Sequence, residues 1–274
     1  MKKILITGSS GYIGSHLVKV LEKKYDVYCL DFVDPTVETK KFINSDIRAF
    51  FGLTDEFDAV VHLAALVNVG ESVIKPNNYD ATNVNGTTNI LNGVTTKNFI
   101  FASTGAAEGL GSPYGISKRM AEDCIKELCQ IKNIDYTIFR FYNVIGTDGI
   151  EPTNVDGLFY NLIQAPKLGY FRIFGDDYNT KDGTCERDYV HVYEICRAIE
   201  LAIENPSNEI ENLGHGIGTT VLEMVNLFKE VNNVKFETMF GSRRPGDLES
   251  SVLKNPSKYM ERLYKLQDLL KIDK

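Results

Sequence analysis

The sequence predicts an α/β protein in which a doubly wound parallel sheet is joined to a smaller C-terminal lobe. Three observations lead to this prediction: strand-like and helix-like segments alternate in the first half, the first turn between them is rich in glycine, and the alternation stops near Gly146. Regular alternation of this kind gives parallel strands with helices on both faces of the sheet. Ligands of such sheets bind beyond the carboxyl ends of the strands.

The first strand is predicted at residues 3–7, a short apolar run. The glycine-rich segment 8–14 follows and leads into a helix that reaches Lys24. Such glycines let the backbone approach a pyrophosphate, and a helix N-terminus offers free N–H groups and a positive dipole. An ordinary strand–turn–helix unit that binds nothing is the alternative interpretation. The position of the turn between a strand and a helix favours dinucleotide binding.

A second strand-like run, residues 26–31, ends in the carboxylate of Asp31. A carboxylate at this point accepts hydrogen bonds from both hydroxyls of an adenosine ribose, and it repels a 2′-phosphate. Asp31 therefore predicts that the cofactor is NAD and not NADP.

The rest of the first half continues the alternation. Residues 58–63 form another strand and run into Ala64 and Ala65, whose small side chains leave room for a flat ring system at the strand end. Further strands are predicted at 42–44, 98–102 and 136–141, and further helices at 79–94 and 114–130.

The second half lacks this regular alternation. The segment 187–192 leads into a helix up to Glu204, which we expect to return to the sheet. The other predicted elements are helices at 158–163 and 221–231, strands at 171–175, 210–213 and 234–239, and a terminal helix. We expect a small second lobe that faces the strand ends and has no independent core.

Composition and charge narrow the class of protein. The 274 residues suffice for one large or two small domains, and the formal net charge of −7 argues against a nucleic-acid partner. No apolar run approaches the length of a membrane span, and Met-Lys-Lys is followed by a strand rather than a signal core, which predicts a cytoplasmic protein. The five cysteines show no paired spacing and the four histidines no ligand spacing, so we expect reduced thiols and no metal site.

The predicted chemistry is carried by Tyr114 and Lys118, which lie four residues apart on one face of a helix. An ammonium beside a phenol favours the phenolate, and Lys118 together with a cationic nicotinamide could stabilise it enough to give a general base at neutral pH. Thr104, at the end of the preceding strand, would offer a hydroxyl to the same substrate oxygen. A lone Tyr-x-x-x-Lys is usually an ordinary amphipathic helix. Here the dinucleotide turn and the strand ending in Ser-Thr favour catalysis.

These motifs together resemble the extended short-chain dehydrogenases/reductases, and most closely their UDP-glucose 4-epimerase branch. The resemblance runs nearly end to end and is carried by Gly8-x-x-Gly11-x-x-Gly14, Asp31, Asp46-Ile47-Arg48, His62-Leu63-Ala64-Ala65, Asn83-Val84-x-Gly86-Thr87, Tyr114-x-x-x-Lys118, Arg140-Phe141-Tyr142-Asn143-Val144, Gly183-Thr184-x-x-Arg187-Asp188-Tyr189-x-His191-Val192, Asn212-Leu213-Gly214-x-Gly216 and Arg244-Pro245-Gly246-Asp247. It implies a Rossmann domain at 1–147 and 187–209 that binds NAD. A lobe at 148–186 and 210–274 would bind the nucleotide sugar.

The resemblance also implies roles for single residues. The catalytic residues would be Tyr114, Lys118 and Thr104. The cofactor would contact Gly8, Gly11, Tyr12, Ile13, Gly14, Asp31, Asp46, Ile47, Leu63, Ala64, Ala65, Asn83, Ser103, Tyr114, Lys118 and Phe141. The UDP-sugar would contact Thr104, Tyr114, Asn143, Leu158, Phe174, Arg187, Arg244, Asp247 and Ser251. A homodimer that pairs two helices of each subunit is the habit of the family.

Some positions depart from the family pattern. Val67 stands where a residue such as Lys is usual, and the segment between Thr104 and Tyr114 is much shorter than usual. Glu108 in that segment is either a rim carboxylate or a solvated side chain, and we favour the solvated state. Ser251, or Val252 if the alignment shifts by one, is small where a bulky Tyr excludes N-acetyl sugars. This predicts acceptance of the N-acetylhexosamine pair.

Two other functions are considered. A nucleotide-sugar 4,6-dehydratase, decarboxylase or reductase would share the first half of the chain, but dehydratases place an acidic pair directly after the Thr. Here the residues after Thr104 are Gly105, Ala106 and Ala107. A non-catalytic NAD-binding sensor tends to lose the Tyr or the Lys, and this chain has both.

Overall fold

The computed structural model describes residues 1–244 and 246–272. The chain forms two compact units, the first comprising Met1–Phe141 with Cys196–Glu211 and the second Tyr142–Ile195 with the chain from Asn212 onward. The predicted NAD-binding domain (1–147 and 187–209) and nucleotide-sugar lobe (148–186 and 210–274) are defined by the ligand that each would bind, and this division stays a prediction.

The first unit is built on a central sheet. Within the described residues it has seven strands in the order β12-β8-β7-β5-β1-β2-β3, and the printed pairings from β8 to β3 are all parallel, as predicted. The strands are β1 (Lys3–Thr7), β2 (Asp26–Asp31), β3 (Phe42–Asn44), β5 (Ala59–His62), β7 (Asn98–Thr104), β8 (Asp135–Phe141) and β12 (Ile210–Leu213). The order reverses between β1 and β5, which is the point where doubly wound sheets bind their ligands.

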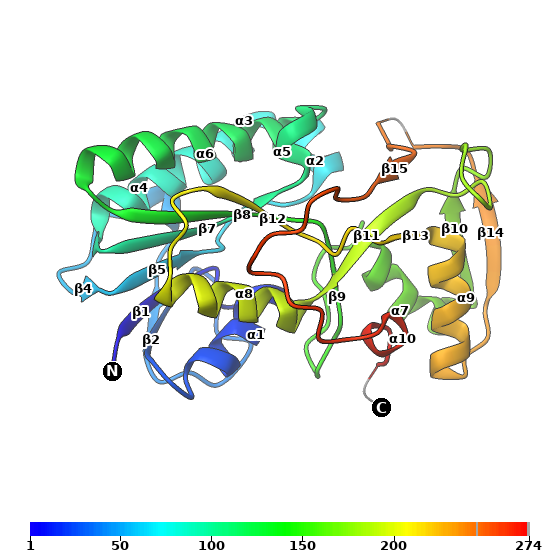
Figure 1. The fold of residues 1–274 in the computed structure, drawn as a ribbon, viewed down its shortest axis with the longest axis horizontal. Helices are drawn as coiled ribbons and strands as arrows, with labels where there is room; N and C mark the ends of the chain where they lie inside the picture. Colours follow the sequence, from blue (N-terminus) through cyan, green and yellow to red (C-terminus); the bar gives the residue numbers. More distant parts are fainter. Residues whose placement is uncertain (245, 273–274) are drawn as a thin grey trace. The chain divides into compact units, whose positions relative to one another are not determined.

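Helices cover both faces of this sheet. Figure 1 shows α1 (Tyr12–Leu21) on one face with the part of α8 (Val192–Glu204) that belongs to this unit, and α4 (Thr87–Gly93) and α6 (Pro113–Lys132) on the other. The second face buries a core of apolar residues from strands and helices, including Leu5, Val60, Phe99 and Ile125. Parallel strands covered in this way are apolar throughout, which is why the sequence shows them as short continuous apolar runs.

The helix predicted at 79–94 is part of an unbroken helical run of three segments. It begins as α3 (Pro76–Tyr79), passes through a π-helix at Asp80–Gly86 and continues as α4. A π-helical segment inside a helix is rare and frequently lies at a functional site. Smaller elements of this unit are α2 (Val69–Ile74), α5 (Ala106–Gly109), β4 (Glu56–Phe57), β6 (Thr95–Thr96) and a 3-10 turn at Ile47–Ala49.

The second unit has its own hydrophobic core, so the expectation of a lobe without one is wrong. Apolar side chains from its strands and helices pack together, among them Phe159, Leu162, Phe171 and Phe228. Its elements are β9 (Asn143–Ile145), α7 (Leu158–Leu168), β10 (Tyr170–Phe174), β11 (Glu186–His191), β13 (Gly218–Thr220), α9 (Val221–Asn232), β14 (Glu237–Gly241), β15 (Ser250–Ser251) and α10 (Leu266–Leu269). The strand predicted at 234–239 corresponds to β14, which begins three residues later than predicted, at Glu237. Among the described residues, no helix has the length and apolar composition needed to cross a membrane.

Candidate functional site

The glycine-rich turn joins β1 to α1 at the reversal point of the sheet. Gly8 has a φ of +73°, and a Cβ added there would lie 2.6 Å from the backbone nitrogen of Ala64. A Cβ on Gly14 would strike the carbonyl oxygen of Gly8, and the Gly11 N–H donates to that same oxygen at 3.2 Å. The turn thus requires glycine for both its conformation and its close packing. The backbone of this turn, residues 8–14, leads into the N-terminus of α1, and we call it the glycine cradle.

Asp31 lies at the carboxyl end of β2, beside this turn. Its carboxylate accepts hydrogen bonds from the backbone N–H groups of Ser10 at 3.0 Å, Phe32 at 2.8 Å and Val33 at 3.2 Å. These bonds orient the carboxylate at the strand end, where the sequence analysis places the adenosine ribose. The glycine cradle and Asp31 together fit a dinucleotide.

The Asp46–Ile47 pair follows β3, the strand next to β2 in the sheet. Asp46 caps the short 3-10 turn and is bonded to the Arg48 guanidinium, whose hydrogen bonds hold the pKa of this carboxyl below its usual value. Ile47 is buried, and its side chain occupies the space next to Gly86 in the π-helix.

A buried chain of hydrogen bonds starts at the end of β5. The His62 ring is fully buried, with Nδ1 2.6 Å from the Thr7 hydroxyl and Nε2 2.9 Å from the Thr87 hydroxyl. Thr87 donates its own proton to the Asn83 carbonyl, so His62 donates from Nε2 and accepts at Nδ1. Burial lowers the pKa of this imidazole to about 3. His62 is therefore a neutral structural group that fixes the strand end before Leu63, Ala64 and Ala65.

The two predicted catalytic side chains lie at the start of α6. Ser112 caps this helix by accepting from the Gly115 N–H at 3.1 Å, and Pro113 occupies its first turn. Tyr114 and Lys118 follow on one face, and both are buried. The Lys118 ammonium lies 4.1 Å from the centre of the Phe101 ring, a cation–π contact.

Burial dominates the protonation of this pair. It raises the pKa of the Tyr114 phenol to about 12, although a hydrogen bond with Thr104 acts in the opposite direction. Burial likewise lowers the pKa of the Lys118 ammonium to about 7, against the attraction of the Glu122 carboxylate. The expected phenolate relies on Lys118 together with a cationic nicotinamide, so it stays a prediction for the protein with its cofactor. Both groups lose the water that stabilises their charged forms.

A buried ion-pair network lies next to the Tyr114–Lys118 face of α6. Arg140 on β8 donates to both Glu122 oxygens, at 2.8 and 2.6 Å, and Ser103 donates to the same carboxylate at 2.5 Å. Arg140 also binds Glu108 at 2.9 Å. Glu108 is exposed, which agrees with the preference for a solvated side chain, and its carboxylate is in addition paired with a buried guanidinium. Phe141, next to Arg140, lies in register with Thr104.

Sequence reasoning missed Glu122 and Arg140. The signal was present, since Glu122 is one turn beyond Lys118 on α6 and Arg140 lies in register with Ser103. Tyr79 was missed as well, and it was detectable only from its contact with the Tyr114 ring.

The second unit gathers the residues predicted to bind the nucleotide sugar. Arg187 lies 3.9 Å from Asp247, and Arg244 donates to the same carboxylate at 2.8 Å. The Arg244 guanidinium lies 5.0 Å from the centre of the Phe174 ring. Ser251 on β15 is the register partner of Arg187 on β11. The result is a group of two guanidinium ions around one carboxylate, bordered by an aromatic ring, in which Arg244 is half exposed and Arg187 and Asp247 are mostly buried.

The other two predicted substrate residues belong to the same unit. Asn143 on β9 donates to the Asp188 carbonyl at 3.1 Å and lies in register with Tyr189 on β11. Leu158 begins α7, and it packs against the core of the unit.

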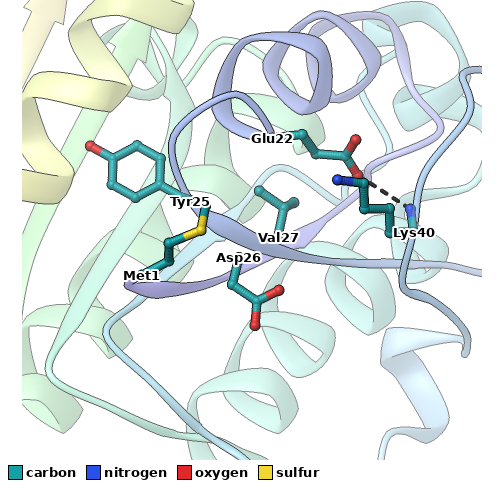
Figure 2. A pocket seen from close by; sticks show the side chains of 6 residues that line it. All are labelled: Met1, Glu22, Tyr25, Asp26, Val27 and Lys40. Carbon is teal, nitrogen blue, oxygen red and sulfur yellow. Dashed lines mark hydrogen bonds between the residues drawn. The ribbon is translucent and has the colours of Figure 1, made fainter.

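A cavity of about 270 Å³ lies elsewhere in the first unit (Figure 2). Its lining comes from the end of α1, the start of β2 and the segment around Lys40, where Glu22 accepts from the Lys40 N–H. This is the amino end of the strands, opposite to the glycine turn. None of the predicted site residues lines it.

Comparisons with known proteins agree with this geometry. Residues 4–214 match the family model of the NAD dependent epimerase/dehydratase family. A UDP-glucose 4-epimerase of Lactobacillus helveticus is 34% identical over 292 residues, which covers 91% of this chain and 88% of that protein. The crystal structure of UDP-glucose 4-epimerase from Brucella ovis in complex with NAD superposes with a TM-score of 0.88 at 27% identity, covering 98% and 96% of the two chains. UDP-N-acetylglucosamine 4-epimerase from Methanobrevibacter ruminantium reaches 0.82 at 25% identity, covering 98% and 97%.

Proposed function

Because this chain belongs to the NAD dependent epimerase/dehydratase family, we propose that it interconverts UDP-hexoses at C4 by means of bound NAD. The observation that carries the proposal is the buried Tyr114–Lys118 face with Thr104, in the same unit as the glycine cradle and Asp31. The relatives named UDP-glucose 4-epimerase support the same activity.

Residues of the first unit would hold the cofactor. The backbone of the glycine turn would bind the pyrophosphate and Asp31 the adenosine ribose, with Asp46 and Ile47 toward the adenine. Leu63, Ala64 and Ala65 would line the dinucleotide. NAD, when bound, supplies a hydride acceptor and a positive charge.

Tyr114 would act as the general base on the sugar 4-hydroxyl. Its phenol has a pKa near 12 in the protein alone, so the phenolate needs cationic stabilisation at about 1.4 kcal/mol per pKa unit. Thr104 would hold the same sugar oxygen, and Lys118 would supply charge and bind the nicotinamide ribose. Loss of the 4-hydroxyl proton and of the C4 hydride would leave a 4-keto sugar; once that sugar has turned over, return of the hydride to its other face and of the proton from Tyr114 would make the net redox change zero.

The second unit would bind the nucleotide sugar. Arg187 and Arg244 would donate charge-assisted hydrogen bonds to the diphosphate, which suits planar guanidinium groups. Asp247, now bonded to Arg244, would reach the nucleoside ribose. Asn143, Leu158 and Phe174 complete the proposed subsite. Leu158, Phe174, Arg244 and Asp247 belong to the predicted lobe at 148–186 and 210–274, whereas Asn143 and Arg187 belong to the predicted NAD domain at 1–147 and 187–209.

A dehydratase is disfavoured by the segment after Thr104. The only carboxylate between Thr104 and Tyr114 belongs to Glu108, and Arg140 binds it. No acidic pair is left there to move the C5 and C6 protons.

We extend the proposal to N-acetyl sugars. Ser251 lies in register with Arg187, so it borders the proposed diphosphate subsite with a small side chain. The structural likeness to a UDP-N-acetylglucosamine 4-epimerase supports this extension.

We also propose a homodimer in the cytoplasm. Large apolar side chains are exposed on α2 (Val73, Ile74) and on α6 (Ile116, Met120), and these helices lie against each other. Exposed apolar clusters of this kind mark interaction sites. The five free cysteines suit a reducing compartment. Light scattering on the purified protein tests the dimer, and a monomeric mass would contradict it.

The cofactor assignment is tested by denaturing the purified protein and separating the released compounds by chromatography. We expect NAD or NADH, because a reaction without net redox gains nothing by releasing the cofactor. Finding NADP, or no dinucleotide together with no affinity for NAD in a titration, would overturn the assignment.

A further inference from the structure

The helical run Pro76–Gly93 presents one stripe of polar side chains to the interior of the first unit. Tyr79, Asn83 and Thr87 are spaced four residues apart, and all three are buried. Thr87 holds the Asn83 carbonyl through the hydrogen bond described above. The π-helix spans the middle of this stripe.

One side of the stripe holds the loop that follows Ala64 and Ala65. Asn83 accepts from the Leu66 N–H at 2.9 Å and donates to the Leu66 carbonyl at 3.0 Å. The Tyr79 hydroxyl donates to the Asn68 carbonyl at 2.6 Å. Loop 66–68 is therefore fixed at three points beside the segment proposed to line the dinucleotide.

The other side of the stripe meets the start of α6. The second amide proton of Asn83 goes to the Ser117 hydroxyl at 3.0 Å, and Ser117 donates to the Tyr114 carbonyl at 2.9 Å. The Tyr79 ring meets the Tyr114 ring at a centre distance of 6.3 Å and an angle of 78°. This is the edge-to-face arrangement that aromatic pairs prefer. It limits the positions open to the Tyr114 phenol.

We propose that Tyr79 and Asn83 are positioning residues, which clamp loop 66–68 to the start of α6 and so hold the Tyr114 phenol in its working position. The two residues use consecutive turns of one helix to join the cofactor side of the site to its catalytic helix. Both amide protons of Asn83 are used inside the protein, so it acts on the cofactor through the loop. The proposal rests on the proposed function only in that Tyr114 is the general base.

Three variants test the clamp. Tyr79→Leu removes the ring contact and the hydroxyl with its hydrogen bonds to Asn68 and Glu71, whereas Tyr79→Phe removes the hydroxyl and keeps the ring. Phe57→Leu is the matched control, because Phe57 is buried and makes a similar edge-to-face contact with Tyr28 at 5.3 Å and 84°, away from α6. Turnover, substrate KM, NAD affinity and amide hydrogen exchange would be measured for each.

We expect Tyr79→Leu to lower kcat by about 10- to 100-fold, since small displacements of catalytic groups cost this much. Substrate KM and NAD affinity should change far less. Tyr79→Phe should fall between wild type and Tyr79→Leu, and it remains informative if the Leu variant does not fold. Hydrogen exchange should rise in residues 64–68 and 113–118 together, and Phe57→Leu should leave both segments and kcat as in wild type. In a Tyr114→Phe background, Tyr79→Leu should cost no further activity.

Two results would overturn the clamp. One is a kcat for Tyr79→Leu equal to that of Phe57→Leu. The other is an exchange increase that spreads evenly over the unit instead of affecting the two segments. If wild type itself has no epimerase activity, the proposed function fails, and hydrogen exchange without added cofactor still decides on the clamp.

Discussion

The proposed catalytic face of α6 and the arginine cluster of the second unit hold their charges in different ways. Lys118 and Tyr114 are buried, and burial moves both pKa values toward the neutral forms. The Arg187 side chain is mostly buried and that of Arg244 is half exposed, but both share Asp247 as a counter-ion. The difference separates two tasks: a group that exchanges protons needs a displaced pKa, whereas a group that binds phosphate needs a permanent charge.

The largest effect should come from removing the base. Tyr114→Phe keeps the ring and its contact with Tyr79 but loses the hydroxyl, and general base catalysis contributes about 10²- to 10⁴-fold. We expect a loss of kcat in this range on UDP-galactose, with NAD and UDP affinity retained. Tyr136→Phe, outside the site, is the control. Activity within a factor of a few of wild type would show that another base operates.

Lys118→Met should cost nearly as much activity and also change the pH dependence of folding. The unfolded chain keeps the Lys118 proton up to its ordinary pKa of 10.5, whereas the folded chain loses it near pH 7. Folding stability therefore rises with pH between these values, by at most about 1.4 kcal/mol per pH unit. Urea unfolding across this interval should give a steeper rise for wild type than for the variant. Parallel curves would contradict a buried Lys118.

Arg187→Ala and Arg244→Ala should act on binding rather than on chemistry. Each loses one charge-assisted contact, for which about 1.5–3 kcal/mol is typical, so UDP affinity should fall roughly 10- to 100-fold. Calorimetric titration of UDP measures this, with the surface variant Arg119→Ala as control. Unchanged UDP affinity would show that these arginines do not belong to the subsite. The contrast with the α6 pair would then fail as well.

The smallest effect should be one of selectivity. Ser251→Tyr adds a ring next to Arg187, and well-packed sites do not take extra volume without cost. We expect kcat/KM for the N-acetyl sugars to fall about tenfold relative to that for UDP-glucose and UDP-galactose, with Ser251→Ala unchanged. If wild type rejects N-acetyl sugars, or Ser251→Tyr treats both pairs alike, another residue forms this wall.

Local spacing made much of the site predictable. The glycine turn, Asp31 and the Tyr114–Lys118 pair lie within single strand–helix units, and the structure places them as the alternation requires. Contacts between distant segments were not predictable in this way. The Glu108–Arg140 pair, the Tyr79 contact and the core of the second unit all depend on tertiary packing. The burial that raises the pKa of Tyr114 in the protein alone was not predictable either, because spacing shows a neighbouring ammonium but does not show burial.

The most direct test of the account is to incubate the purified protein with UDP-galactose, without added cofactor, and to follow the products by NMR. The account predicts that UDP-glucose accumulates until the two sugars reach a constant ratio, with no 4-keto product left over. Tyr114→Phe, loaded with the same NAD, should leave UDP-galactose unchanged on that time scale. A dehydrated or reduced sugar as the product, or no conversion by wild type that contains NAD and binds UDP, would contradict it.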